Sequence, residues 1–194
     1  MSIWVGHGLR PEHRAPAAQL YWQAFGGKLG RVMGPEAKAL RFIERVMSDR
    51  HVISAFDSTG QLVGVIGFRT HGGSFVGGDR SDLVAVYGRF GAVWRNACLA
   101  VLATDQEASV MIVDGLAVSS AARGAGVGAA LIEALCIEAR ARGFRELRLD
   151  VVGENLRARA LYERMGFQVQ NRSTSRLTAL IFGFHTAFVM ARVL

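Results

Sequence analysis

The stretch SSAARGAGVGAALIEAL, residues 119–135, places glycine and alanine directly before a helix-like pattern. Such small side chains leave the backbone open, and the first amides of a helix lack partners and lie at the positive end of its dipole. A helix start of this kind binds anions, typically a phosphate group. Because the β-rich segment SVMIVDGLAV, residues 109–118, comes immediately before it, the sequence predicts a strand, a phosphate-binding turn and a helix in succession.

The composition limits the class of phosphate-binding protein. A chain of 194 residues with 51% hydrophobic residues can bury one sizeable core, so we predict a single domain over residues 1–194. Cys98 and Cys136 have no disulfide-framework or metal-ligand spacing, which favours a reducing, cytoplasmic location and no metal site. The N-terminus lacks a signal-peptide pattern. The net charge of +7 suits a polyanionic cofactor, and since no basic run concentrates it, we expect no nucleic-acid partner.

The N-terminal half predicts a short strand, two helices and a hairpin. The first helix begins at Pro11, and the second follows Pro35. We expect the first helix to end at the glycines Gly26, Gly27 and Gly30. The segments HVISAF and QLVGVIGF on either side of the turn-rich DSTG predict the hairpin. The next segment, GGSFVGGD at residues 72–79, predicts a flexible loop.

The C-terminal half predicts strands around one further helix. RELRLDVV, residues 145–152, alternates as a strand, and NLRARALYERM is typical of a helix that Asn155 caps and Gly166 ends. The last segment, residues 177–194, is expected to form one or two strands.

Spacing separates the glycine stretch from two common phosphate loops. The dinucleotide-binding fingerprint requires G-x-G-x-x-G, whereas Gly124, Gly126 and Gly128 are spaced by two. The P-loop requires a lysine after the glycines, and none follows. The pattern Arg123-x-x-Gly126-x-Gly128 after a strand instead resembles the pyrophosphate loop of the GNAT superfamily of N-acetyltransferases.

A second motif strengthens this resemblance. The segment ENLRARALYERMGF, residues 154–167, is similar to the conserved helix of the family, in which an asparagine and a tyrosine face the coenzyme. Asn155 and Tyr162 are seven residues apart, so helical geometry places them on one face. Residues 110–167 carry the resemblance as the coenzyme-binding core, and over residues 1–71 it is topological only.

The resemblance implies an α/β (α+β) fold with a mixed central sheet of about six to seven strands flanked by helices. Its two central parallel strands, here residues 109–118 and 145–152, splay apart, and acetyl-CoA binds as co-substrate in place of a strand partner. Arg123 would shape the pyrophosphate loop or add charge, although the glycines could instead only allow close helix–sheet packing. The implied coenzyme-binding residues are Leu116, Ala117, Val118, Arg123, Gly124, Ala125, Gly126, Val127, Gly128, Ala129, Asn155, Ala158 and Tyr162.

The implied reaction transfers an acetyl group to a primary amine by direct attack in a ternary complex. Tyr162 occupies the family position of the general acid that protonates the departing thiolate, or it is a core tyrosine. Asp114 borders the acceptor site as a candidate base, directly or through water, or it is a strand-end aspartate held by a backbone amide. A backbone N–H near Leu116 or Val118 would stabilise the oxyanion.

Several alternatives stay open. His71 and His185 are weaker candidates for the base. The acceptor could be a small molecule, a protein N-terminus or a lysine, because variable N-terminal helices and loops form acceptor pockets in this family. A non-catalytic acyl-CoA-binding regulator on the same fold is a different class, although a pure binder would not need an acid at Tyr162.

A helical insert at about residues 80–104, before the central strand, departs from the plain family pattern. Its segment 83–103 approaches the length of a membrane span, but Arg89, Arg95 and Asn96 interrupt it, so we expect no membrane partner. Its apolar residues occupy more than one face. We predict that Tyr87, Phe90 and Trp94 help to form the acceptor pocket and a homodimer contact, with Arg89 and Arg95 at polar edges or facing an acidic substrate group. The alternative is a helix buried in its own domain.

Overall fold

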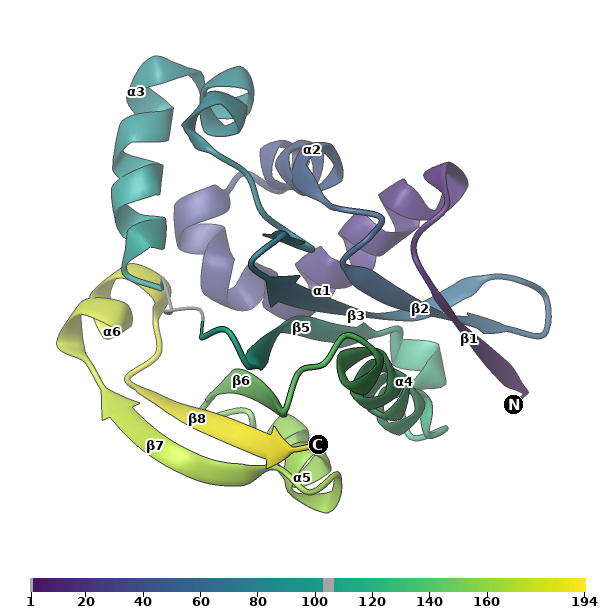
Figure 1. The fold of residues 1–194 in the computed structure, drawn as a ribbon. Helices are drawn as coiled ribbons and strands as arrows, with labels where there is room; N and C mark the ends of the chain where they lie inside the picture. Colours follow the sequence, from purple (N-terminus) through teal and green to yellow (C-terminus); the bar gives the residue numbers. More distant parts are fainter. Residues whose placement is uncertain (1, 103–106) are drawn as a thin grey trace.

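The computed structural model describes residues 2–102 and 107–194, and Figure 1 labels its elements. The strands are β1 (Ile3–His7), β2 (Val52–Asp57), β3 (Leu62–Thr70), β4 (Gly73–Ser74), β5 (Val110–Val118), β6 (Glu146–Val152), β7 (Gln168–Thr174) and β8 (Thr186–Val193). The α-helices are α1 (Arg14–Met33), α2 (Glu36–Val46), α3 (Arg80–Ala100), α4 (Val127–Ala141), α5 (Leu156–Arg164) and α6 (Arg176–Phe182). Short 3-10 helices, Pro11–His13 and Ser120–Ala122, precede α1 and α4.

One mixed sheet joins these strands in the order β1-β2-β3-β5-β6-β8-β7, and β4 pairs with β3 beside that path. Neighbouring strands are antiparallel except β5 and β6, which form the central parallel pair. This mixed sheet with its flanking helices confirms the predicted α/β fold. The described strands number eight, one more than the upper predicted number, because the two-residue β4 also pairs with β3. A strand this short shows no pattern in the sequence.

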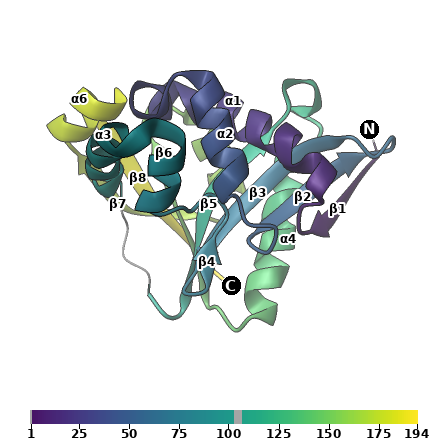
Figure 2. The ribbon, with the colours of Figure 1, turned by 90° about the horizontal axis from the view of Figure 1, so that it is seen from above.

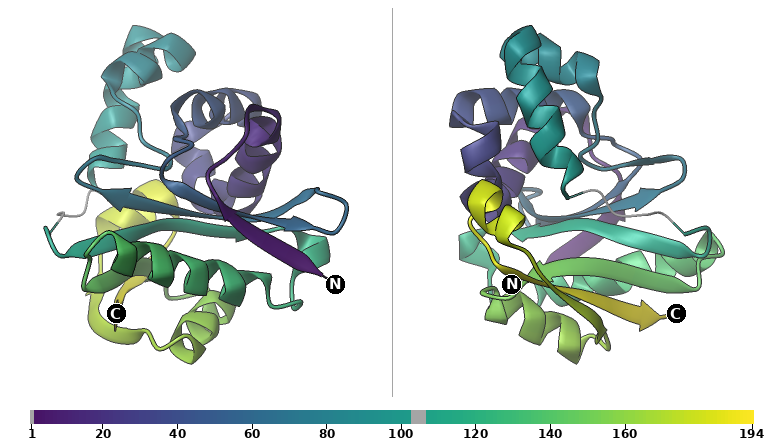
Figure 3. Two further views of the ribbon diagram at one scale, coloured as in Figure 1. Left: turned by 45° about the vertical axis from the view of Figure 1, so that its right-hand side comes forward. Right: turned by 90° about the vertical axis from the view of Figure 1, so that its left-hand side faces the viewer.

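Helices cover both faces of the sheet. α1 and α2 lie over one face, and α4 and α5 lie over the other (Figure 1, Figure 3). Successive side chains of a strand point to opposite faces, so β3 divides its residues between two cores. Val65 packs with Ala17 and Tyr21 of α1, whereas Ile66 packs with Leu131 of α4.

The first helix is longer than the sequence predicts. α1 continues through Gly26, Gly27 and Gly30 and ends at Met33, so the expected break at these glycines is wrong. Each glycine costs a helix about 1 kcal/mol. Burial of the α1 side chains against the sheet, with Tyr21 among them, outweighs that cost because each fully buried apolar side chain contributes about 1.5–3 kcal/mol.

The C-terminal segment contains a helix as well as the predicted strand. β8 confirms the strand, but residues 176–182 form α6. The Ser175 hydroxyl accepts hydrogen bonds from the Leu177 and Thr178 amides, and Gly183 ends the helix with a φ of 82°. Both are ordinary helix-cap residues. The apolar run between them is equally typical of a strand, so the sequence alone does not indicate the helix. β7 is an unpredicted edge strand whose residues are all exposed, so its sequence shows no alternation.

The predicted helical insert is confirmed as α3, which a capping box at Asp79 begins and which bends at Gly88. It lies beside α2 and close to α6 (Figure 2). The Tyr87 hydroxyl donates a 2.6 Å hydrogen bond to the Met33 carbonyl, and Arg95 Nη2 donates to the Gly34 carbonyl at 3.0 Å. Arg95 thus holds α3 to the α1–α2 corner from a half-buried position. Residues 103 and 104 of the predicted insert lie outside the described residues.

The loop at residues 72–79 is anchored, although its glycines predict flexibility. Phe75 within it is fully buried between β3 and α1, and the Phe75 amide donates a hydrogen bond to the Phe68 carbonyl at 3.2 Å. Burial of Phe75 and the bridge between Met47 and Val76 therefore anchor this loop. In the described ranges, no helix is long and apolar enough to cross a membrane.

Candidate active site

The two central parallel strands separate soon after they begin. β5 and β6 pair only over Val110–Ile112 and Glu146–Arg148. Beyond this point β5 stays paired with β3 as far as Val118, and β6 stays paired with β8 as far as Val152. The facing edges of β5 and β6 therefore lose their ladder, which confirms the predicted splay. A cavity of about 560 Å³ opens there, and we call it the strand-gap cavity.

The glycine loop forms one end of the strand-gap cavity. Gly124 and Gly126 have φ of +86° and +82°, the left-handed region that side chains disfavour, and a Cβ built on either would meet open space. Gly126 is the N-cap of α4 and has no side chain to cap it. The first helical hydrogen bond runs from Ala130 to Gly126, so the amides of residues 127–129 are available to an anion.

Gly128 and Arg123 have packing roles in the same loop. A Cβ on Gly128 would lie 3.0 Å from the Leu161 side chain, so this glycine allows α4 to approach α5. Arg123 Nε donates to the Val118 carbonyl at 3.3 Å, which ties the loop to the end of β5. The packing alternative therefore holds for Gly128, whereas Gly124 and Gly126 combine a sharp turn with open space.

Asn155 and Tyr162 both line the strand-gap cavity from α5. The Asn155 side chain accepts from the Ala158 amide at 3.1 Å, which confirms it as the helix cap. Tyr162 is buried, and its ring packs edge-on against Phe167. Burial raises the pKa of Tyr162 to about 12, so its hydroxyl carries a proton throughout the physiological range.

A second cavity of about 760 Å³ adjoins the first, and we call it the helical cavity because α1, α2, α3 and α6 contribute to its walls. The two cavities share part of their lining. The shared residues are Phe25, Lys28, Val113, Asp114, Asp150 and Val151. We call this shared lining the junction. A molecule in the strand gap and a second molecule in the helical cavity would meet there.

Asp114 lies at the junction, at an irregularity of the sheet. The pairing register between β3 and β5 shifts at Gly67 and Phe68, which leaves Asp114 without a counterpart on β3. Such a bulge redirects a side chain. Asp114 Oδ1 accepts from Arg69 Nη2 at 2.9 Å and Oδ2 from the Val76 amide at 3.3 Å, with the side chain only 7% exposed. The aspartate is thus held by a backbone amide and also faces both cavities.

α1 supplies the junction residues that the sequence patterns miss. The Phe25 ring lies against β5, where a Cβ on Gly115 would be 2.7 Å from it. Lys28 is 5.8 Å from the Phe25 ring centroid, and burial lowers its pKa while Glu154 opposes the shift. In sequence both residues are ordinary members of an amphipathic helix, so only a known fold would single them out.

The predicted coenzyme residues gather at the strand-gap cavity, which all of them line except Ala117 and Ala125. The Ala117 side chain points to the other face of the sheet and joins the core under α1. The Ala125 amide is used within the loop, where it donates to the Ala122 carbonyl at 3.3 Å. His71 and His185 are exposed and line neither cavity.

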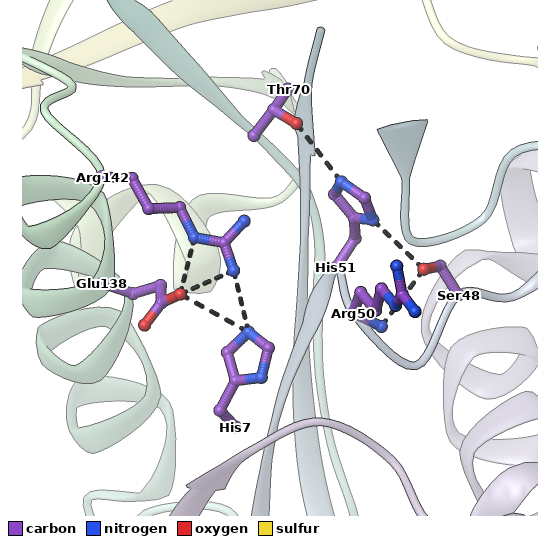
Figure 4. A network of polar contacts seen from close by, with 7 residues as sticks. All are labelled: His7, Ser48, Arg50, His51, Thr70, Glu138 and Arg142. Carbon is purple, nitrogen blue, oxygen red and sulfur yellow. Dashed lines mark hydrogen bonds and ion pairs between the residues drawn. The ribbon is translucent and has the colours of Figure 1, made fainter. Parts of the chain in front are cut away.

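Two other histidines belong to a polar network outside both cavities (Figure 4). The His51 ring nitrogens lie 3.1 Å from Ser48 Oγ and 3.2 Å from Thr70 Oγ1. Burial, followed by the nearby Arg142, lowers the pKa of His51. His7 lies 3.5 Å from Glu138 of α4. These contacts connect strand ends and α4, so the network supports the fold and not the cavities.

The separated strands β5 and β6 and the uncapped start of α4 agree with the coenzyme site that the sequence resemblance implies. The sequence model of the acetyltransferase (GNAT) family matches residues 15–167 of this chain. The chain belongs to that family, which uses acetyl-CoA with an acceptor. No curated protein sequence matches it significantly.

Solved structures share the fold at low sequence identity. A Corynebacterium glutamicum protein described as histone acetyltransferase HPA2 and related acetyltransferase is 22% identical, with a TM-score of 0.68 over 99% of this chain and 96% of that one. The ribosomal-protein-S18-alanine N-acetyltransferase of Escherichia coli is 16% identical, with a TM-score of 0.60 over 99% and 94%. An acetyltransferase from Bacillus anthracis, in complex with acetyl coenzyme A, is 16% identical, with a TM-score of 0.50 over 74% and 61%.

Proposed function

We propose that this protein is an acetyl-CoA-dependent N-acetyltransferase that transfers the acetyl group to a primary amine by direct attack in a ternary complex. The observation that carries the proposal is the junction, where the strand-gap cavity and the helical cavity share one wall. Two substrates bound side by side can react there without an acyl-enzyme intermediate, because binding supplies proximity and orientation.

The strand-gap cavity would hold acetyl-CoA through backbone groups. The pyrophosphate would accept hydrogen bonds from the amides of residues 127–129, while the pantetheine amides would pair with the free edge of β5 at Leu116–Val118. The open space at Gly124 and Gly126 supports this assignment, because no side chain there competes with the coenzyme.

The chemistry needs a proton acceptor, an oxyanion donor and a proton donor. The amine nitrogen attacks the thioester carbon, the C–S bond breaks, and the amine loses a proton. In the proposal Asp114 takes this proton, directly or through water, and the Leu116 or Val118 amide stabilises the carbonyl oxygen. Tyr162 returns a proton to the departing thiolate. The position of Tyr162 supports a donor role, because the buried residue lines the strand-gap cavity and its hydroxyl is protonated at neutral pH.

Two alternatives are weaker on the same observations. A non-catalytic acyl-CoA-binding regulator would not need the buried Tyr162 hydroxyl in the strand-gap cavity. A protein N-terminus or lysine as acceptor would have to reach the junction past the large apolar side chains of α1, α2 and α3 that line the helical cavity. The two free cysteines, Cys98 and Cys136, support a cytoplasmic location.

We also propose that the exposed face of α3 forms a homodimer contact. Phe90 is 94% exposed, and Val93 and Trp94 are 54% and 43% exposed on the same helix. Large exposed aromatic side chains are typical of protein–protein contacts. Tyr87, by contrast, is buried.

The direct test of the proposed activity uses purified protein, acetyl-CoA and a panel of amines, aminoglycosides, polyamines and peptides. Release of the CoA thiol is measured together with the mass of the product. An acetylated amine supports the proposal. Tight acetyl-CoA binding without acetylation of any compound would contradict catalysis and favour the regulator.

A further inference from the structure

The walls of the helical cavity are apolar over most of their extent. Helices α1, α2 and α3 contribute large side chains, among them Trp22, Leu29, Phe42, Leu83 and Leu99. A volume of about 760 Å³ falls in the range of pockets that enclose a small ligand. Because each buried CH₂ group contributes about 0.8 kcal/mol, such walls favour a ligand with a large apolar part.

The charged side chains of this cavity gather at one end. Lys28, Asp114 and Asp150 lie at the junction, and Arg69 forms a 2.9 Å ion pair with Asp114. The other residues that line the cavity in the described part of the chain carry no charge. Among the described lining residues, the two cations Lys28 and Arg69 balance the two carboxylates at this end of the cavity, so these residues provide no excess of negative charge to bind a polycation.

We propose that the acceptor is a small primary amine with a single positive charge on an apolar body, such as a medium-chain alkylamine or an arylalkylamine. The amine lies at the junction beside the thioester, and the apolar body extends between α1, α2 and α3 toward Trp22, Phe42 and Leu99. This inference rests on the proposed function, because it names the acceptor class of the same site. It also gives α3 a role in acceptor specificity.

The first test is the rate with a homologous series of amines. For propylamine, butylamine, pentylamine and hexylamine, kcat/KM should rise about fourfold for each added methylene, the effect of burying one CH₂ group. The matched control is 1,6-diaminohexane, which has the length of hexylamine but carries a second charge into the apolar walls. Its kcat/KM should be lower than that of hexylamine by at least about tenfold.

The second test changes one wall residue. Leu99 of α3 lines the helical cavity, whereas Ala97, two residues earlier, is exposed and lines neither cavity. Leu99→Arg should raise KM for hexylamine on the order of tenfold and leave acetyl-CoA affinity unchanged. Ala97→Arg, the matched control, should change neither value. Leu99→Ala should flatten the dependence on chain length, which a simple loss of folded protein would not do.

The outcomes separate this inference from the proposed function. If acetyl-CoA does not bind, or no compound of any class is acetylated, the proposed function is wrong and the acceptor class falls with it. If spermidine or a peptide reacts faster than hexylamine, or if kcat/KM does not change along the series, the acceptor class is wrong while the acetyltransferase activity stands. A rising series with weak turnover of the diamine supports the inference.

Discussion

The strand-gap cavity and the helical cavity lie side by side but are built differently. The strand-gap cavity takes most of its lining from residues 113–165, and its binding groups are backbone amides and strand edges. The helical cavity takes its lining from segments between Tyr21 and Ala187, and its character comes from side chains.

The difference determines what a substitution can do in each cavity. A site made of backbone requires particular φ values and bare amides, so a side chain at Gly126 removes it. A site made of side chains can change its preference one residue at a time while the fold stays the same. Under the proposed function, the strand-gap cavity would hold the coenzyme, and the side chains of the helical cavity would select the acceptor.

The largest effect is expected from Gly126→Val. A β-branched side chain at a φ of +82° strains the loop by about 1–2 kcal/mol and stands before the free amides of α4. Acetyl-CoA affinity should fall on the order of 100-fold or more, since charge-assisted hydrogen bonds are lost, and calorimetry measures it. Gly143→Val is the matched control, because Gly143 has a φ of +81° and lines neither cavity. Equal affinity in the two variants would contradict the backbone site.

The next effect concerns the rate of the chemical step. Tyr162→Phe should lower kcat on the order of 100-fold, the size expected for one general acid, with little change in acetyl-CoA affinity. Because burial raises the pKa of Tyr162 to about 12, the wild-type rate should show no loss from this group up to about pH 10. Tyr87→Phe, which removes the hydrogen bond to Met33, is the control. Full activity of Tyr162→Phe would exclude this tyrosine as the acid.

A smaller effect is expected from Asp114→Asn. If Asp114 takes the amine proton through water, kcat/KM at pH 7 should fall about tenfold, less than for a base in direct contact. The loss should shrink as pH rises, because more of the acceptor amine is then already neutral. Loss of the Arg69 contact should also lower stability by about 1–3 kcal/mol. A rate deficit that is the same at every pH would indicate a positioning role through Arg69 and Val76.

The smallest expected effect on chemistry comes from the exposed face of α3. Phe90→Glu combined with Trp94→Glu should convert a homodimer into a folded monomer, measured by light scattering, because the charges oppose burial at the contact. Acetyl-CoA affinity should not change. If both proteins are monomers with the same acceptor kinetics, the exposed face of α3 forms no contact of this kind and does not affect acceptor binding.

The coenzyme half could be predicted from sequence because its signals are local. Gly124, Gly126, Asn155 and Tyr162 lie in two short motifs that resemble those of the GNAT family, and the structure brings them to one cavity. A motif does not show which face of a strand each side chain occupies. Ala117, for example, lies within the motif but points to the opposite face of the sheet.

The acceptor half could not be predicted in the same way. Phe25, Lys28 and Leu99 look like ordinary helix residues, and only the packing of α1 and α3 brings them to one cavity. Tertiary packing also explains why α1 continues through its glycines, although the low helix propensity of glycine predicts that the helix ends there. Arg95 contacts the Gly34 carbonyl, a partner far away in sequence. The sequence does not predict α6, because its apolar run is also typical of a strand.

Amide hydrogen exchange with and without acetyl-CoA tests the central claim most directly. The account predicts that acetyl-CoA slows exchange at the open amides of residues 127–129 and at the Leu116 and Val118 amides on the free edge of β5, because these amides would gain partners. Exchange in α3 and α6 should slow only when an acceptor amine or its acetylated product is added with the coenzyme. Binding of acetyl-CoA that leaves the Leu116 and Val118 amides and those of residues 127–129 unprotected would contradict the account.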